Sequence, residues 1–166
     1  MAMPKVGLMT FGDERDYMWE GYFGPLTRPR HEEAVAYLGS LPLELLAFDE
    51  VARSRQEIDR QVRELQAAGA EALFAHTPCW CTPNMAVRAV QRLGLPTVVM
   101  TSTSAATHGM VGMLATAGTL SQIGIDHIRV RDDFGSPVFE QKVLPFFRAA
   151  SARARLHGRV MGLFGG

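Results

Sequence analysis

The sequence lacks an excess of charge of either sign, because 17 lysines and arginines balance 17 aspartates and glutamates among its 166 residues. A balanced charge gives no electrostatic footprint for nucleic acid or for an anionic membrane surface, so we expect neither as a partner. No apolar run approaches the length that crosses a bilayer, and the first five residues lack the apolar core of a signal peptide. We therefore expect a cytoplasmic protein.

Cysteine is also scarce, and the two cysteines, Cys79 and Cys81, are separated by a single residue. They cannot form the long-range disulfide framework of a secreted domain, so reduced thiols are expected. Structural zinc sites use wider spacing and a second pair, and redox dithiols have two residues between the sulfurs. A metal half-site with His76 and His108 is therefore disfavoured, and the favoured interpretation is two small residues that shape a turn.

The loop after the first expected strand lacks most of the glycines of a dinucleotide-binding turn. Gly12 is followed by Asp13 and Glu14, whose charges would repel a pyrophosphate, so a nucleotide cofactor is not expected. Arg15 in the same loop can donate hydrogen bonds to substrate hydroxyls or to a carboxylate. A surface ion pair is the equally favoured alternative for this arginine.

What the sequence does contain is an alternation of short apolar runs and helical patterns, which is typical of a parallel α/β sheet. It predicts one domain with a doubly wound, flavodoxin-like three-layer sandwich and a mostly parallel sheet of five to six strands. The expected strands are Val6–Thr10, Leu43–Phe48, Glu71–Ala75, Thr97–Thr101, His127–Val130 and Val160–Phe164.

Local signals mark where the intervening helices begin. Ser54 and Glu57 have the spacing of a capping box. Thr82 can cap a further helix that has Pro83 at its first position. In the last expected helix, Pro145 should either kink the helix or mark its true start.

The stretch from 13 to 39 is less regular. Large apolar and aromatic side chains cluster within Tyr17–Phe23, ahead of Pro25 and Pro29, and a helix is expected over Glu32–Leu38. An aromatic cluster in a long loop is either a hydrophobic lid or a surface that contacts a partner. The sequence leaves both readings open.

The segment His76–Cys81 is the most informative part of the sequence, because it follows an expected strand and precedes an expected helix. In open parallel sheets, ligands bind beyond the carboxyl ends of the strands. Trp80 is therefore expected to present a ring face that stacks on the C–H face of a sugar or another small polyol. The alternative is a core aromatic under the edge of the sheet.

A serine–histidine–acid triad can also be drawn from the loops. Ser102 and Ser104 follow the fourth expected strand together with His108, and Asp132–Asp133 follow the fifth. However, no G-x-S-x-G elbow holds a serine on the strained turn that a nucleophile needs. A small hydrolase is therefore kept as a third hypothesis, and capping of the next helix is the favoured role for the hydroxyls.

The segment Thr77–Cys81 resembles the T-P-C-W-C motif in the first domain of L-fucose isomerase. The opening strand at Lys5–Gly7 and the arginine-bearing loop at Asp13–Arg15 are similar to the same domain. So are Gly158–Arg159 and their continuation into Gly165–Gly166. The resemblance spans nearly the whole chain, and the five-residue motif is its most specific part.

This resemblance implies a manganese-dependent aldose–ketose isomerase acting on L-fucose or D-arabinose, with a relative in L-arabinose isomerase. In such enzymes the metal bridges two sugar oxygens, and a carboxylate moves a proton between neighbouring carbons through an enediol. The family's metal ligands, two acids and a histidine, lie in later domains, so this chain is expected to hold neither metal ligands nor catalytic residues. By similarity, Trp80 stacks on the sugar and Arg15 hydrogen-bonds its hydroxyls, in a site of a neighbouring subunit within a trimer or hexamer.

Residues 1–157 are accordingly expected to form the N-terminal domain. Residues 158–166 are expected to begin the first strand of a following domain that is missing, so the chain is expected to be a fragment.

Two departures from L-fucose isomerase leave the sugar undetermined. Thr82–Pro83 replace a longer loop after the cysteines, and Asp13–Asp16 stand where a glycine and paired arginines are expected. The alternative function is a non-catalytic sugar-binding or oligomerisation module.

Overall fold

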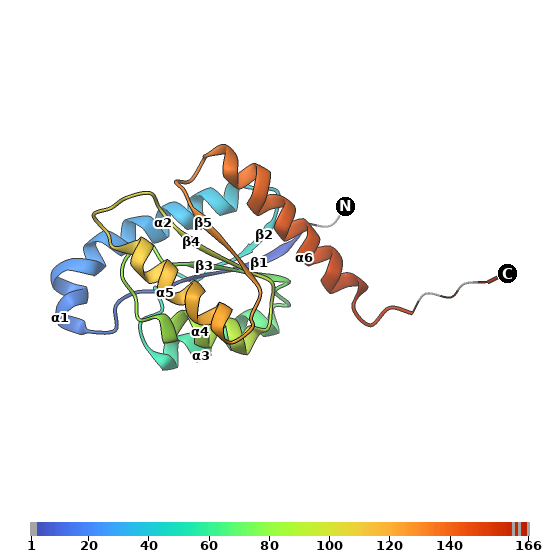
Figure 1. Cartoon of the computed structure of the whole chain (residues 1–166), viewed down its shortest axis with the longest axis horizontal. Helices are drawn as coiled ribbons and strands as arrows, with labels where there is room; N and C mark the ends of the chain where they lie inside the picture. The colour runs from blue at the N-terminus through green and yellow to red at the C-terminus, as the bar shows by residue number, and fades with distance from the viewer. Residues whose placement is uncertain (1–2, 161, 163, 166) are drawn as a thin grey trace.

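The computed structural model describes residues 3–160, 162 and 164–165. A five-stranded parallel sheet lies at its centre, with the strand order β2-β1-β3-β4-β5 (Figure 1). This order confirms the predicted doubly wound, flavodoxin-like α/β fold. The strands are β1 (Lys5–Thr10), β2 (Glu44–Leu46), β3 (Ala72–His76), β4 (Thr97–Thr101) and β5 (His127–Arg131).

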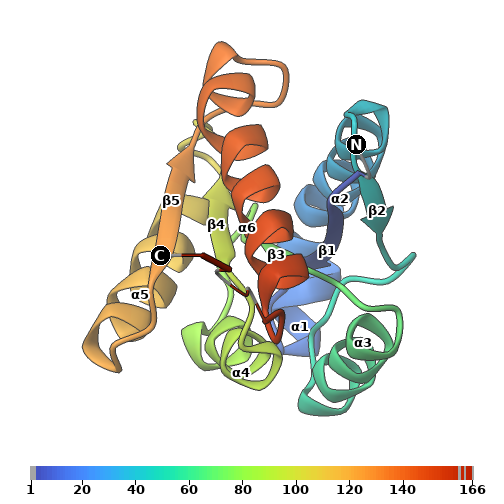
Figure 2. The same cartoon turned by 90° about the vertical axis from the view of Figure 1, so that its right-hand side faces the viewer.

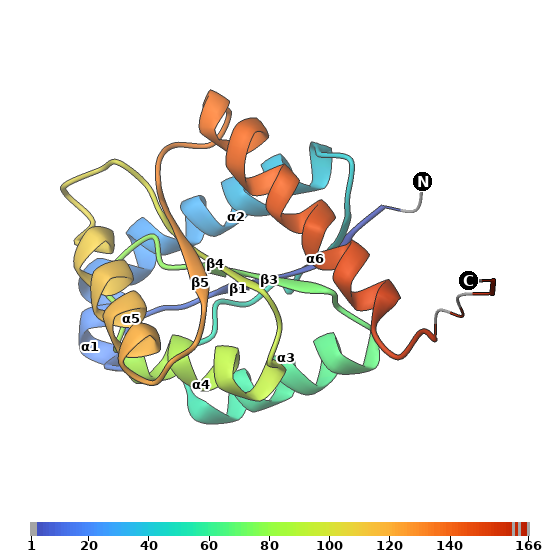
Figure 3. The same ribbon diagram turned by 45° about the vertical axis from the view of Figure 1, so that its right-hand side comes forward.

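Helices cover both faces of the sheet and complete the three layers. In Figure 3, α3, α4 and α5 lie below the sheet, and α2 and α6 lie above it. Figure 2 shows α6 lying across β3 and β4. The helical segments are α1 (Asp16–Met18), the π-helical η1 (Trp19–Phe23), α2 (Gly24–Ser40), α3 (Arg55–Ala67), α4 (Pro83–Leu93), α5 (Gly109–Gln122), the π-helical η2 (Phe139–Val143) and α6 (Leu144–Leu156).

Two apolar clusters hold the layers together. Every residue of β3 and β4 is buried, as expected for central parallel strands that are covered on both faces. Val62 and Leu65 of α3 pack on one face of the sheet, within a cluster that also includes residues of α4 and α5. Phe139 and Phe147 belong to the cluster on the opposite face, together with Phe74 of β3. The sheet is therefore a rigid platform for the loops at its carboxyl edge.

The helix starts largely follow the predicted signals. Ser54 caps α3 in a complete capping box with Glu57, which confirms that prediction. Pro83 opens α4, but Thr82 makes no side-chain cap, because its hydroxyl donates to Glu14 instead, at 3.1 Å. Pro145 lies in the first turn of α6, but the π-helical η2 directly precedes that helix, so Pro145 does not mark the start of the helical stretch.

The stretch expected to be a long loop after the first strand is helical instead, and this expectation was wrong. Helical backbone runs from Asp16 to Ser40 through α1, η1 and α2, with Pro25 in the first turn of α2 and Pro29 inside it. Burial of Trp19 and Phe23 in the π-helical turn provides apolar packing that favours the helix in spite of the prolines. The aromatic cluster is therefore part of a helical arm at the carboxyl edge of the sheet.

The expected sixth strand, Val160–Phe164, includes residues 161 and 163, which lie outside the described residues. Val160 and Phe164 themselves are exposed and belong to no strand in the part of the chain that the structure describes. Within that same part, no helix is long and apolar enough to span a membrane.

Candidate functional site

The T-P-C-W-C loop is fixed to its neighbours by backbone hydrogen bonds at the carboxyl edge of the sheet. Thr77 donates to the Met100 carbonyl of β4 from both its N–H, at 2.8 Å, and its hydroxyl, at 3.2 Å. Cys79 forms an isolated antiparallel bridge with His108, at the start of α5. The loop is therefore held between β4 and α5 before α4 begins.

Trp80 is held by its backbone, and its ring is partly exposed. Its N–H donates to the Thr107 carbonyl at 3.2 Å, and the side chain packs beside the buried cluster of Trp19, Phe23 and Cys79. The residue is partly buried, unlike the fully buried core aromatics such as Phe74.

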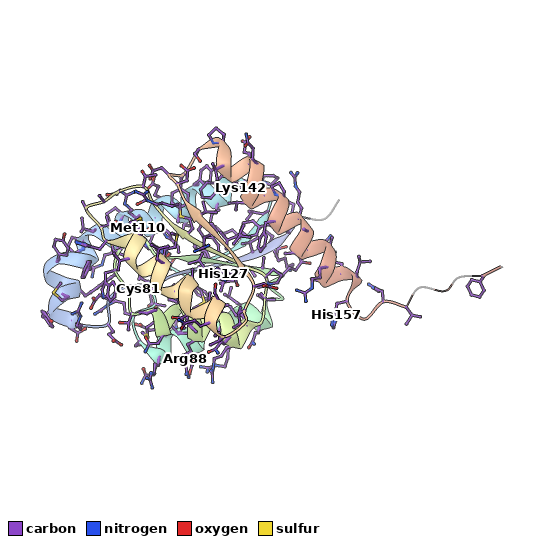
Figure 4. All side chains as sticks on the ribbon, viewed as in Figure 1. Cys81, Arg88, Met110, His127, Lys142 and His157 are labelled. Atoms are coloured by element: carbon purple, nitrogen blue, oxygen red, sulfur yellow. The ribbon has the colours of Figure 1, made fainter. Side chains whose placement is uncertain are left out.

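The two cysteines are fully buried, unpaired thiols that shape this turn. Burial raises the pKa of both thiols, that of Cys81 to about 12, with the negative charge of Asp13 acting in the same direction on Cys81. Protonated thiols are poor nucleophiles and poor metal ligands. Gly112 in α5 lies close to the Cys79 carbonyl and to Cys81, the cysteine labelled in Figure 4, so there is little room for a larger side chain at position 112.

Arg15 is held in a bidentate ion pair by the loop that follows β1. Its Nε and Nη2 donate to the two carboxylate oxygens of Asp13, at 2.9 and 2.6 Å, and its backbone N–H donates to Asp13 Oδ1 at 2.9 Å. The Asp13 side chain is 1 % exposed, whereas that of Arg15 is 46 % exposed. Hydrogen bonding from Arg15 keeps the pKa of Asp13 below its ordinary value, so the pair stays charged at neutral pH.

A second arginine supports the same loop from behind. Arg53 Nε donates to the Asp13 carbonyl at 3.0 Å, and its Nη2 donates to Asp16 at 2.8 Å. Its guanidinium lies 4.5 Å from the centre of the buried Trp19 ring, a cation–π geometry. Gly12 fits closely against Trp19, because an added Cβ would lie 2.5 Å from that ring. These contacts fix the backbone that carries the Asp13–Arg15 pair.

Arg15 and Trp80 face a common cavity of about 590 Å³, which is large enough for a small sugar. The polar and aromatic side chains that line it are Glu14, Arg15, Tyr22, Phe23, Trp80, Thr82 and His108.

His108 is a lining residue that the sequence argument assigned only to weak metal and hydrolase hypotheses. It adopts a left-handed backbone conformation with φ of 55°, the only non-glycine residue to do so in the described part of the chain. Its ring lies edge-on to Phe23, with the centroids 6.4 Å apart. Next to it, any side chain at Gly109 would clash with Thr101 Oγ1 and the Pro78 carbonyl. The strained turn therefore positions the imidazole at the cavity.

A family model described as "L-fucose isomerase, first N-terminal domain" matches residues 3–158. The chain belongs to the L-fucose isomerase family. A search of curated protein sequences finds no match.

The serine–histidine–acid site that the sequence also suggested is not formed among the described residues. Among the described residues, neither Ser102 nor Ser104 hydrogen-bonds to His108, and the buried Ser102 hydroxyl has no partner. This geometry does not provide the serine–histidine contact that the hydrolase hypothesis requires. The part of the chain that the structure describes also holds no group of three His, Cys, Asp or Glu side chains that could bind a metal ion.

A pair of buried histidines beneath the site was not anticipated from the sequence. The Thr10 hydroxyl lies 2.8 Å from His31 Nδ1 and 3.2 Å from His76 Nδ1, and His31 Nε2 lies 2.8 Å from the Phe48 carbonyl. Because a carbonyl only accepts, a neutral His31 carries its proton on Nε2 and accepts from Thr10. Thr10 then accepts from His76 Nδ1–H.

This chain of hydrogen bonds leaves His76 Nε2 buried, without a hydrogen-bond partner among the described residues. Desolvation by burial lowers the pKa of His76 to about 3, so the ring is neutral at ordinary pH. One signal in the sequence pointed to the contact between Thr10 and His76. Both are polar residues at the ends of apolar strands, and the structure places them opposite each other in the sheet.

Proposed function

We propose that this chain is the substrate-contacting domain of an aldose–ketose isomerase that acts on L-fucose, D-arabinose or a related sugar. The observation that carries the proposal is that Trp80 and Arg15 face one cavity from two rigid loops. An aromatic face stacks on sugar C–H groups, and a guanidinium donates to hydroxyl oxygens. Family membership supports the reaction class, because isomerisation of such sugars is the activity that the family's name describes.

The proposal assigns proton transfer and metal binding to residues outside this chain. Manganese would polarise the sugar carbonyl when bound. The donors present here do not fit it, because the thiols of Cys79 and Cys81 are buried with raised pKa values and the described residues hold no ligand cluster. The domain would instead orient the sugar and limit its access to water, for the site of a neighbouring subunit. Reduced thiols are consistent with a cytoplasmic enzyme.

The assembly part of the proposal, a homo-oligomer, is supported by the surface of α5. This helix contains no charged residue, yet Met110, Val111 and Leu114 are more than 40 % exposed. Figure 4 marks Met110 on its first turn. Helices that are apolar on all sides are usually buried, and this face continues into the cavity through Val111. The same surface favours the second candidate function, a non-catalytic oligomerisation or sugar-binding module.

Ligand titration separates these functions. We expect D-arabinose or L-fucose to perturb NMR signals of the cavity residues, and Trp80→Ala or Arg15→Ala to weaken binding at least about tenfold. Arg88→Ala, on the surface of α4, is the matched control and should bind normally. In a manganese-loaded enzyme that contains this domain, the two site variants should lose turnover and keep their metal. Unchanged turnover in both variants would refute the assigned roles, and sugar binding without isomerase activity would favour the module.

A further inference from the structure

Asp13 controls which donors of Arg15 are available to a ligand. A guanidinium has five N–H groups, and the Asp13 carboxylate holds one on Nε and one on Nη2. The three other N–H groups remain beyond this contact, on a side chain that lines the cavity. The Nε/Nη2 edge, which is one of the two edges of a guanidinium that can donate two parallel hydrogen bonds to an anion, is thus already occupied.

The carboxylate itself cannot easily move away. Asp13 is buried, its carbonyl accepts from Arg53, and the preceding Gly12 N–H donates to the Ala52 carbonyl at 3.0 Å. Arg53 in turn is held by Asp16 and by the ring of Trp19. The orientation of the Arg15 guanidinium is therefore set before any ligand arrives, which reduces the entropy lost on binding.

The charges around the cavity disfavour an anion. Asp13 neutralises Arg15, and Glu14, which accepts from the Thr82 hydroxyl, adds a second carboxylate at the same wall. A phosphate group would meet two negative charges and one positive charge that Asp13 already neutralises.

Building on the function proposed above, we propose that Asp13 is a positioning residue that presents Arg15 to neutral sugar hydroxyls and excludes phosphorylated sugars. It acts through Arg15 and does not touch the sugar. The cavity is thereby selective for a free sugar over its phosphate ester.

The test compares two ligands that differ only in a phosphate group, D-arabinose and D-arabinose 5-phosphate. Asp13→Asn keeps the shape of the side chain but removes the charge and one acceptor oxygen. We expect D-arabinose to bind about fivefold to tenfold more weakly and the phosphate ester to bind more tightly than to the unmodified chain. Equal changes of affinity in the same direction for both ligands would show a merely structural role and overturn the proposal.

Two further variants keep the test decisive if Asp13→Asn folds poorly. Arg15→Lys retains the positive charge but loses the bidentate geometry, so it should weaken D-arabinose binding and still reject the phosphate ester. In the Arg15→Ala background, Asp13→Asn should no longer alter the affinity for D-arabinose, because Asp13 acts on the neutral sugar only through Arg15. Normal D-arabinose binding by Arg15→Lys would contradict the positioning role. Normal binding by Arg15→Ala would refute the proposed function itself.

Discussion

His76 carries a buried imidazole that can keep only one proton in the folded protein. Thr10 engages Nδ1, and Nε2 faces the protein interior without a partner among the described residues. Its ring lies edge-on to Phe134, with the centroids 5.7 Å apart. A second proton would place an uncompensated charge in this apolar surrounding, which is why the pKa falls to about 3.

This burial makes the fold sensitive to acid. Between the pKa of an unfolded histidine, about 6.5, and the value of about 3 for His76, this residue binds up to one more proton in the unfolded chain than in the folded chain. The contribution of His76 to the free energy of unfolding is therefore fully present above about pH 6.5 and falls by up to about 1.4 kcal/mol per pH unit below it. Urea unfolding from pH 7 to pH 4 measures this slope. His76→Gln should show a shallower slope, and an identical slope would contradict the assignment.

Gly109 is a residue where the backbone path leaves no space for a side chain. We expect Gly109→Ala to lower the free energy of unfolding by about 1–3 kcal/mol, because the added methyl clashes with Thr101 Oγ1 and the Pro78 carbonyl. Gly118→Ala, in the same helix but facing open space, is the matched control and should be neutral or stabilising by up to about 1 kcal/mol. Thermal unfolding of both variants measures this difference. Equal melting temperatures for Gly109→Ala and Gly118→Ala would contradict the prediction, because they would show that the turn at Gly109 relaxes to accept the methyl group.

At the scale of elements, the two predicted helix caps differ in what their hydroxyls do. Ser54 accepts from the Glu57 N–H at 3.2 Å, whereas the Thr82 hydroxyl donates to Glu14 at the cavity. We expect Ser54→Ala to cost about 1 kcal/mol of stability and leave sugar binding unchanged. Thr82→Ala should cost less stability and change sugar affinity. Denaturant unfolding and ligand titration of both variants test this contrast. A loss of stability in Thr82→Ala as large as that in Ser54→Ala would contradict it.

The sequence predicted those elements in which local signals and tertiary packing agree. The apolar runs of β3 and β4 and the capping box at Ser54 are such cases, and each appears in the structure. The helix expected over Glu32–Leu38 lies within α2, but the earlier part of the arm was missed because its prolines and aromatics suggest a loop. The burial of Trp19 beside Arg28 and Arg53 favours a helix there. Residues 28 and 53 are distant in sequence, so no local pattern could reveal that contact.

The same reasoning applies to the candidate site. Trp80 and Arg15 were predicted as site residues because each follows an expected strand, and parallel strands bring their carboxyl ends to one edge; the structure places both at one cavity. Their grouping in one cavity with Glu14 and His108 depends on the start of α5 folding back onto the Cys79 turn. That approach requires the small residue Gly109, whose role becomes visible only in three dimensions.

At the scale of the whole molecule, the uncharged face of α5 is where a second copy is expected to bind. A face without charge can meet its own copy without repulsion between like charges. We expect Leu114→Glu to reduce self-association in sedimentation velocity experiments over a range of protein concentrations. Ser121→Glu, at the far end of the same helix, is the control and should sediment like the unmodified chain. An unchanged distribution for Leu114→Glu would remove α5 from the proposed interface.

The two tryptophans lie in contrasting surroundings. Trp19 is 4 % exposed and lies beside two guanidinium groups, whereas Trp80 is partly buried and lines the cavity. The tryptophan fluorescence of this protein should accordingly have two components. The emission of Trp19 should stay constant, and the emission of Trp80 should change when a ligand binds in the cavity. Occupancy could then be followed by the intrinsic fluorescence of the unlabelled chain, with quenching by iodide assigning the responsive component to Trp80.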